Sequence, residues 1–562
     1  MAVSAPPAPH DGTNWREETR RAWLMIVICG LLLTSALLWR RVTGHSYPLN
    51  LNWHEGFVAE LRAGVLYPRW LNDTNQQLGA PSFYFYAPLP FFVSGALDLI
   101  SPIRLSTPAY VYASAVISVV CSGLTTFAFT RRVVSSRTAI LAAIVYMAMP
   151  YHLGIDIWWR AAVGELWAFV WPPLILAGAA RQWRGERWGR EVVAASWAGL
   201  IVSHLPSLLI VICGATCTAI AWYLTSRNRG ESRRVIVASA AGLGVALALT
   251  SPYWIPAVTT LGYTDVTRFM TSGWFLYSNN FVLPCKPGSW NGTIEMLLLL
   301  ELLAACALVW LGIRTRRLAS PAFRISVACA VAAVLMMTPI SVAVWRLIPP
   351  LQRVQFPWRF HLLFDLSLVL MLALVLDQSL TRGAWRILRF VAPVLCFGAG
   401  VLWSVVFTPQ YSDVDAQDLR SMRAVRADAN EYRTRWTPLV FYLGIRNGDT
   451  LLSRQIRPHA VSANARGTVR LEHASAQPTD VVLNRFWYPS LRVSAADDGR
   501  GLDTHPEEST GLAVVRVPAG VNAFHTSTAM LAEEKRAWAT AVVTCLVLLA
   551  VRLGRRNAAA RA

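Results

Sequence analysis

Long apolar segments recur along the whole chain and are separated by short stretches rich in arginine. Of the 562 residues, 54% are hydrophobic and only 15% are charged, whereas soluble domains carry about 25% charged residues. An apolar run of about 20 residues is long enough to cross roughly 30 Å of hydrocarbon. The sequence therefore predicts a polytopic membrane protein built mainly of α-helices.

The apolar runs predict about twelve membrane-spanning helices. We expect them at residues 22–40, 107–130, 137–151, 164–181, 191–204, 206–225, 235–256, 293–313, 323–346, 360–378, 386–407 and 537–553. Arg16, Arg20 and Arg21 precede a first run of full spanning length, which is typical of an anchor helix and not of a cleavable signal peptide. Residues 1–21 and 554–562 are then expected to be polar tails.

Arginine-rich clusters fix the predicted orientation of these helices. They lie in alternate connecting segments, around residues 131–137, 181–190, 227–234, 314–317, 382–389 and 552–556. Arginine and lysine accumulate in the cytoplasmic loops of membrane proteins, so both termini are predicted to be cytoplasmic. Because the same rule accounts for the net charge of +20, nucleic acid is not an expected partner.

The run 83–101 is apolar enough to span, but a span there would turn every later arginine cluster outward. Pro88, Pro90 and Asp98 interrupt it, and its first half is aromatic, as interfacial segments are. We therefore predict a juxtamembrane or re-entrant helix at 83–101, within a long outer loop at 41–106.

The segment 408–536 is predicted to form an outer domain before the last spanning helix. Its first part, 413–435, is highly charged and has a helical pattern. From 437 onward, short β-patterned runs alternate with turn signals such as Asp498-Gly499. The predicted fold class is an all-α polytopic membrane protein, with residues 22–407 as the transmembrane domain and a small extracytoplasmic C-terminal β-sandwich of about 100 residues.

Cysteine usage and the motifs that are missing narrow the possible chemistry. Eight of the nine cysteines lie inside apolar runs and only Cys285 lies in a loop, so we expect no disulfide framework. The sequence contains no Walker A loop, no GxGxxG after a strand, no HExxH and no GxSxG elbow. No metal site and no cofactor are indicated, although a divalent cation stays compatible with the chemistry considered below.

Ionisable and aromatic residues gather in the loop that follows the first spanning helix. His54, Glu55 and Arg69 lie there, and so do Tyr84 and Tyr86. Charged groups next to a membrane are costly and tend to mark function. We therefore interpret this loop as the roof of an active site.

A second cluster occupies the next predicted outer loop. Asp156 and Arg160 are four residues apart and can pair on one helical face. Glu165 begins a membrane helix, where placing a charged acid costs free energy. The cluster is either part of a functional site or a structural ion pair flanked by Trp158 and Trp159 as interfacial anchors.

Two further outer positions carry basic or titratable groups. His204 lies between two spans and is either a binding residue or a hydrogen bonder at a helix end. Arg353 and Arg359 lie within PPLQRVQFPWRFH, residues 349–361. The forked donors of arginine can hold a phosphate or pyrophosphate, but binding of lipid headgroups explains them equally well.

Five motifs follow one another along nearly the full chain. They are G-x-L-Y-P-R-W at Gly64–Trp70, G-x-P-x-F-x-F-Y-x-P-L-P at Gly79–Pro90, R-x-x-x-x-E at Arg160–Glu165, Q-F-P-W-R-F at Gln355–Phe360, and a late segment at 485–520. This combination resembles a bacterial membrane family described as "6-pyruvoyl-tetrahydropterin synthase-related" and is similar to the YfhO-like proteins of the GT-C glycosyltransferase superfamily. Nothing in the sequence indicates pterin chemistry.

Resemblance to GT-C enzymes implies transfer of a sugar from a polyprenyl-phosphate donor to a cell-envelope glycan or lipid, outside the bacterial plasma membrane. The implied reaction is an inverting displacement, either metal-independent or metal-assisted. It needs a carboxylate base near the acceptor hydroxyl and cations to hold the leaving phosphate. We expect Glu55 or Asp156 as the base, and Arg160 with Arg353 or Arg359 as phosphate clamps.

The remaining expected substrate-binding residues are Tyr84 and Tyr86, as walls of the sugar pocket, and His54, Arg69, Glu165 and His204. Related sequences carry His-Asp and a second His in the first outer loop, at the positions of His45, Ser46 and Asn50 here. The replacement of the second and third residues favours an alternative, a catalytically inactive GT-C relative that binds polyprenyl lipid or scaffolds envelope assembly. A flippase or transporter ranks third, because the sequence shows no internal repeat of the kind transporters carry.

Overall fold

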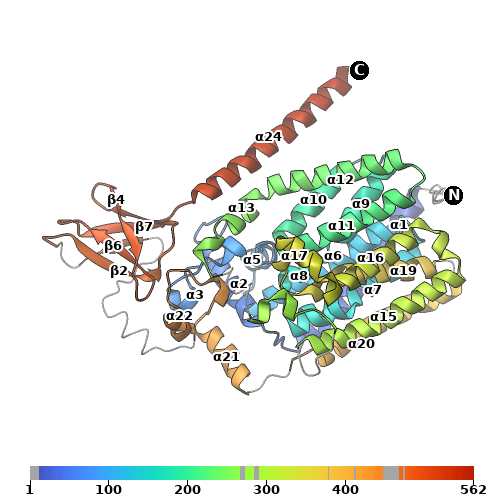
Figure 1. The fold of residues 1–562 in the computed structure, drawn as a ribbon, viewed down its shortest axis with the longest axis horizontal. Coiled ribbons are helices and arrows are strands. Elements are labelled where there is room, and N and C mark those ends of the chain that lie inside the picture. The colour runs from blue at the N-terminus through green and yellow to red at the C-terminus, as the bar shows by residue number, and fades with distance from the viewer. Residues whose placement is uncertain are drawn as a thin grey trace. The chain divides into compact units, whose positions relative to one another are not determined.

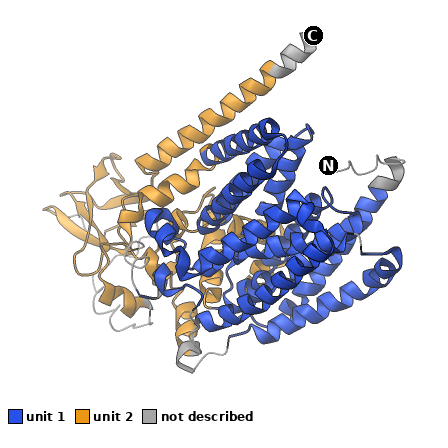
Figure 2. Cartoon of the chain, turned by 45° about the vertical axis from the view of Figure 1, so that its right-hand side comes forward, with its two compact units in different colours: residues 1–44, 112–247, 272–409 blue, residues 45–111, 248–271, 410–562 orange. Residues whose placement is uncertain are grey.

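The computed structural model describes residues 12–265, 273–283, 290–377, 379–409, 413–446, 467–471 and 475–561. The chain divides into two compact units (Figure 2). Unit 1 comprises residues 1–44, 112–247 and 272–409, and unit 2 comprises residues 45–111, 248–271 and 410–562. Cys285 lies outside the described residues, and the other eight cysteines are free thiols.

All the regular secondary structure in the described residues of unit 1 is helical. Its helices are α1 (Gly12–Thr34), η1 (Ser35–Leu38), most of α6 (Thr107–Thr130), α7 (Ser136–Ala148), η2 (Pro150–Trp159), α8 (Val163–Ala168), α9 (Trp171–Trp183), α10 (Gly189–Ser203), α11 (Leu205–Thr225), α12 (Arg229–Leu249), η4 (Gly273–Phe275), η5 (Tyr277–Asn279), α15 (Trp290–Arg314), η6 (Arg317–Ala319), α16 (Pro321–Met337), η7 (Pro339–Ser341), α17 (Val342–Leu347), α18 (Pro349–Gln352), η8 (Pro357–Phe360), α19 (His361–Leu376) and α20 (Arg382–Val406). Within the bundle α9 packs against α10, and α19 packs against α15 and α16 (Figure 1). Helix α1 packs against α20.

Among the described residues, ten helices are long and apolar enough to cross a membrane, or eleven if one bent pair counts as a single span. These ten match ten of the twelve predicted spans. The predicted span 323–346 is the bent pair, broken by 84° between Met337 and Pro339, because proline has no amide hydrogen to continue a helix. The predicted span 191–204 is α10, which has only 15 residues. The prediction of a polytopic helical membrane protein is confirmed.

The predicted span 137–151 extends further than expected, because α7 continues into the π-helix η2. A π-helix closes hydrogen bonds five residues apart, as from Arg160 N to Ile155 O at 2.9 Å, and such segments are frequent at functional sites. This extension contains Tyr151 and Asp156, and both residues are buried.

Unit 2 joins the loop after the first span to the C-terminal part of the chain. Its helices are α2 (Tyr47–Arg62), the turn α3 (Thr74–Gln77), α4 (Ser82–Phe85), α5 (Leu89–Ile100), the start of α6, α13 (Ser251–Thr259), η3 (Leu261–Tyr263), α21 (Asp413–Ala424), η9 (Asn430–Tyr432), α22 (Leu439–Arg446) and α24 (Ala532–Arg561). The run 83–101 folds into α4 and α5, and α5 has 12 residues, fewer than a span needs. Its position relative to a membrane stays a prediction.

Two motifs of the first loop depend on each other. Gly79 has φ of +83°, and a Cβ there would meet the indole ring of Trp70 at 2.5 Å. Any residue other than glycine at position 79 would therefore be strained in its backbone and would collide with the ring.

The C-terminal part of unit 2 contains two antiparallel sheets. One has the strand order β1-β7-β3-β4, from β1 (Gly467–Arg470), β7 (Ala523–Thr528), β3 (Leu491–Ala495) and β4 (Gly501–Leu502). The other has the order β2-β6-β5, from β2 (Thr479–Phe486), β6 (Leu512–Val517) and β5 (Thr504–Pro506). Alternate residues of both sheets share one apolar core. The predicted small C-terminal sheets are confirmed, except that α22 is helical at 439–446, where strands were expected.

Candidate functional site

Four charged side chains meet in the interior of unit 1. The exposed fraction is 1% for Asp156, 3% for Arg160, 1% for Glu165 and 7% for Arg359. We call these four residues the charge cluster. Their formal charges sum to zero, which is the condition for keeping charged groups out of water.

Local backbone geometry brings the first three members together. The π-helix η2 ends at Trp159, Arg160 caps it, and Ala161 turns the chain with φ of +55°. The amide of Ala162 then returns to Asp156 O at 2.7 Å before α8 begins. Gly44 packs against this turn so closely that a Cβ there would lie 2.6 Å from Arg160 C.

Glu165 is the centre of the charge cluster. Arg160 Nη1 donates to Glu165 Oε2 at 2.7 Å and to Asp156 Oδ1 at 2.9 Å. Arg359 Nε lies 3.0 Å from Glu165 Oε2, and Tyr151 Oη donates to Glu165 Oε1 at 2.6 Å. Two arginines thus converge on one buried carboxylate.

Asp156 uses only one of its two carboxylate oxygens. Its Oδ1 accepts from Arg160, but its buried Oδ2 has no hydrogen-bond partner among the described residues. A buried carboxylate oxygen that accepts no hydrogen bond has a lone pair free to accept a proton from a substrate hydroxyl.

The other two predicted site residues of unit 1, His204 and Arg353, do not belong to the charge cluster. His204 is the residue before α11, where its side chain does not cap the helix, and its Nδ1 lies 2.8 Å from Ser207 Oγ. His204 also lies within electrostatic range of Glu165. Arg353 is exposed and forms no ion pair with any described residue.

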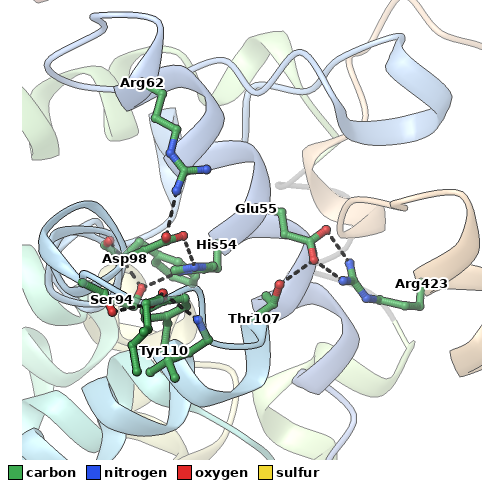
Figure 3. A network of polar contacts seen from close by, with 12 residues as sticks. His54, Glu55, Arg62, Ser94, Asp98, Thr107, Tyr110 and Arg423 are labelled. Carbon is green, nitrogen blue, oxygen red and sulfur yellow. Dashed lines mark hydrogen bonds and ion pairs between the residues drawn. The ribbon is translucent and has the colours of Figure 1, made fainter.

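In unit 2, Glu55 is held by cations from the C-terminal part of the chain (Figure 3). It accepts from Thr107 Oγ1 at 2.8 Å and from Arg423, and Arg426 Nε lies 3.7 Å away. Burial raises the pKa of Glu55, but the hydrogen bonds from Arg423 and Thr107 outweigh it and leave the pKa below its ordinary value. A carboxylate held in this way is a weak base.

His54 lies beside Glu55 but faces the opposite side of α2 (Figure 3). Its Nδ1 lies 2.9 Å from Ser94 Oγ and its Nε2 lies 3.4 Å from Asp98 Oδ2, while Arg62 donates to Asp98 Oδ1 at 2.8 Å. Burial lowers the pKa of His54, against the opposing effect of Asp98. Ser94 and Asp98 are one turn apart on α5 and Ser94 is 1% exposed, so this trio fastens α2 to α5 and offers no accessible nucleophile.

The remaining predicted residues of unit 2 also have partners there. Arg69 Nε lies 2.5 Å from Glu534 Oε1, and Tyr84 Oη donates to Glu534 Oε2 at 3.2 Å. Burial raises the pKa of Tyr84. The ring of Tyr86 packs on Trp53 with centroids 4.3 Å apart.

The positions aligned with the family's ionisable residues lie at the start of α2. Ser46 precedes the helix without capping it through its side chain, and Asn50 is fully buried on it. No ionisable group occupies either position.

Several buried acids were not singled out from the sequence. They include Glu301 on α15, Asp365 on α19, Asp428 after α21 and Glu534 on α24. A signal existed for the first two, because an acid inside an apolar run of spanning length marks a functional position by default. Asp428 stands in a highly charged stretch, where nothing in the sequence distinguishes a buried acid from a solvated one. Among the described residues, no group of three or more His, Cys, Asp or Glu is placed to hold a metal ion.

Comparison with known proteins adds little to this geometry. No protein-family profile matches the sequence, and no curated protein matches it. Among solved structures the chain is similar to ArnT from Cupriavidus metallidurans, crystallised with undecaprenyl phosphate, at 17% identity and a TM-score of 0.43, over 80% of this chain and 74% of that chain. A similarity of this size carries no conclusion about residues or activity.

Proposed function

We propose that this chain is a membrane glycosyltransferase of GT-C type, which moves a sugar from a polyprenyl-phosphate donor to a cell-envelope acceptor on the extracytoplasmic face. The convergence of Arg160 and Arg359 on Glu165 is the observation that carries the proposal. It brings together two motifs that are far apart in the sequence and that the family resemblance had already singled out.

The two arginines supply the expected phosphate clamp. Arg160 uses Nη1 for both carboxylates and forms no hydrogen bond from Nε or Nη2 to a described residue. Arg359 uses Nη1 for the carbonyl of Val354 at 2.6 Å. Guanidinium groups fixed in this way present unused N–H donors in a rigid fork, which matches the oxygens of a phosphate monoester or diester.

Asp156 is the proposed base, in preference to Glu55. Its Oδ2 would take the proton of the acceptor hydroxyl while the hydroxyl oxygen bonds to the anomeric carbon of the donor sugar. The bond from that carbon to the donor phosphate breaks, and the two arginines stabilise the charge on the leaving polyprenyl phosphate. Asp156 is 1% exposed, so neighbouring side chains must move before an acceptor reaches it.

The low exposure of Asp156 favours one alternative, a relative that binds polyprenyl phosphate without transferring sugar. Ser46 and Asn50 also favour this alternative, because neither side chain can act as a base. In that case the arginines retain their role and Asp156 serves only to fix Arg160.

The test compares three variants of the full-length protein, Asp156→Asn, Arg359→Gln and the matched control Arg353→Gln on the same segment. Binding of undecaprenyl phosphate is measured by native mass spectrometry, and envelope glycans and lipids are profiled in a deletion strain that carries each variant. We expect D156N to bind the lipid but restore no product, and R359Q to bind about 10- to 100-fold more weakly, because a hydrogen bond to a charged group contributes about 1.5–3 kcal/mol.

Arg353 is exposed and outside the charge cluster, so R353Q is expected to behave as the wild type. Full restoration of product by D156N would refute the base. A deletion strain with unchanged glycans and lipids, together with lipid binding that depends on Arg359, would instead establish the non-enzymatic alternative.

A further inference from the structure

Two ionisable groups that the proposed reaction does not use face each other inside unit 1. Glu301 lies within the membrane-length helix α15 and His361 begins α19. Their exposed fractions are 6% and 0%, and Glu301 Oε2 lies 3.4 Å from His361 Nε2.

The hydrogen-bond pattern of His361 fixes where its ring hydrogen lies. Nδ1 is 2.7 Å from the carbonyl oxygen of Trp358, and a carbonyl oxygen only accepts, so the hydrogen is on Nδ1. In the neutral ring Nε2 then presents a lone pair to Glu301 Oε2. Two acceptors that face each other repel unless a proton lies on one of them.

No other described group relieves this contact. Neither oxygen of Glu301 has a hydrogen-bond partner among the described residues, and the same is true of His361 Nε2. Asp365, one turn further along α19, is fully buried, lies within electrostatic range of Glu301, and has no hydrogen-bond partner among the described residues on either oxygen. A second uncompensated acid makes a negative charge on Glu301 still more costly.

Other ionisable side chains near Glu301, His361 and Asp365 include Tyr146, Tyr151 and Glu165, of which Glu165 belongs to the charge cluster. The ring of Tyr151 stacks on that of His361 with centroids 4.8 Å apart and planes 5° apart, and Tyr151 Oη donates to Glu165. Glu165 lies within electrostatic range of His361, and Tyr146 lies within range of Asp365. No described arginine or lysine forms an ion pair with Glu301 or Asp365.

We propose that Glu301 and His361 form a proton-binding site within the membrane-spanning part of unit 1, which holds one proton between Oε2 and Nε2. The proton moves from the carboxylic acid to the ring nitrogen, which leaves a carboxylate and an imidazolium, and returns by the reverse step. The stack with Tyr151 places this exchange next to the charge cluster, so the charge on His361 acts on Glu165. The proposal does not depend on any sugar transfer.

His152 provides a matched internal control. It is fully buried, its Nδ1 lies 3.1 Å from the carbonyl oxygen of Tyr146, and its ring stacks on Phe169 with centroids 4.1 Å apart. Its Nε2 also has no hydrogen-bond partner among the described residues, but unlike His361 it forms no ion pair with any carboxyl group in those residues. The two histidines therefore differ mainly in the acid.

The test uses full-length protein in lipid nanodiscs, labelled with 15N-histidine. Ring-nitrogen NMR at neutral pH reports a proton on His361 Nε2, and infrared spectroscopy reports a protonated Glu301 through its carboxylic acid C=O band. We expect at least one of these two signals in the wild type and its loss or shift in Glu301→Gln. His152 should show a bare Nε2 in both proteins.

His361→Gln assigns the nitrogen signal if the Glu301 variant fails to insert. The proposal is overturned if His361 shows the same bare Nε2 as His152 and no carboxylic acid band is sensitive to Glu301→Gln. This result would leave the charge cluster and its proposed reaction untouched.

Discussion

Three buried acids of this chain are stabilised in three different ways. Glu165 pairs with two arginines, Glu534 pairs with one arginine and a tyrosine hydroxyl, and Asp428 forms no ion pair with any described residue. Asp428 accepts from Trp53 Nε1 at 2.6 Å and from Ser82 Oγ at 3.1 Å. Neutral donors offset the lost hydration of a carboxylate less than a guanidinium does, so the charged form of Asp428 is less stabilised than that of Glu165 or Glu534.

Asp428 therefore makes stability depend on pH. Burial raises the pKa of Asp428 to about 7, whereas an unfolded aspartate has a pKa of about 3.9. Between these values the folded state keeps a proton that the unfolded state has lost, so stability falls as pH rises from about 4 to about 7, by up to about 1.4 kcal/mol per pH unit, and is level above.

Thermal unfolding of wild type and Asp428→Asn across this pH range checks the prediction. The difference between the two proteins should change with pH and become constant above about pH 7. Asp73→Asn, at an exposed carboxylate paired with Arg426, should keep the wild-type profile. Parallel profiles for D428N and the wild type would contradict the assignment.

At the scale of residues, the sequence predicts a contact when partners are close along the chain or when a motif singles them out. The contacts of Arg160 with Asp156 and Glu165 are predictable from their spacing along the chain. Arg359 joins them only through the fold, and in the sequence it stands out only through its motif. The partners of Glu55 and Arg69 were not predictable, since Arg423 and Glu534 reach them from the far end of the chain.

At the scale of elements, the start of α24 is fixed by a single acid. Glu534 accepts from the backbone amide of Leu531 at 2.7 Å, as an acid in the first helical turn does, and it also pairs with Arg69. One side chain thus caps the helix and neutralises a guanidinium that is 7% exposed.

Replacing Glu534 by Gln should destabilise unit 2 by about 3–5 kcal/mol, because it leaves Arg69 buried without a counter-charge. Glu533→Gln, one residue earlier and more exposed, should change stability by no more than about 0.5 kcal/mol. Thermal unfolding together with limited proteolysis measures both. Equal melting temperatures for the two variants would show that the buried pair contributes nothing.

Apolar length predicted the elements better than any other signal. Ten spans follow directly from it, since hydrocarbon thickness sets helix length. Apolar length failed to predict the elements where a proline interrupts a helix. Pro339 divides one span, and Pro88 lies between α4 and α5, with Pro90 in the first turn of α5.

At the scale of the whole molecule, the placement of arginine clusters predicts which segments share a side of the membrane. Asp73 and Asp156 should both face outward, and the Arg181–Arg190 segment should face the cytoplasm.

Labelling of intact cells with a membrane-impermeant maleimide tests this topology. Asp73→Cys, at a side chain that is 43% exposed, should be labelled from outside, and Arg187→Cys should be labelled only after the cells are broken. Labelling of both, or of Arg187→Cys alone, in intact cells would reverse the predicted orientation and remove the basis for an extracytoplasmic reaction.

The interleaving of the two units has a consequence for biosynthesis. The first loop and the C-terminal region fold into one body, but roughly 300 residues separate them, which a ribosome needs about 15–60 s to make at 5–20 residues per second. During this interval Trp70, Arg69 and the face of α2 that later binds the 422–428 segment lack the neighbours that the C-terminal region supplies. For most of its synthesis the nascent chain therefore exposes side chains that are buried in the folded protein. We expect its dependence on chaperones to end only when α24 emerges.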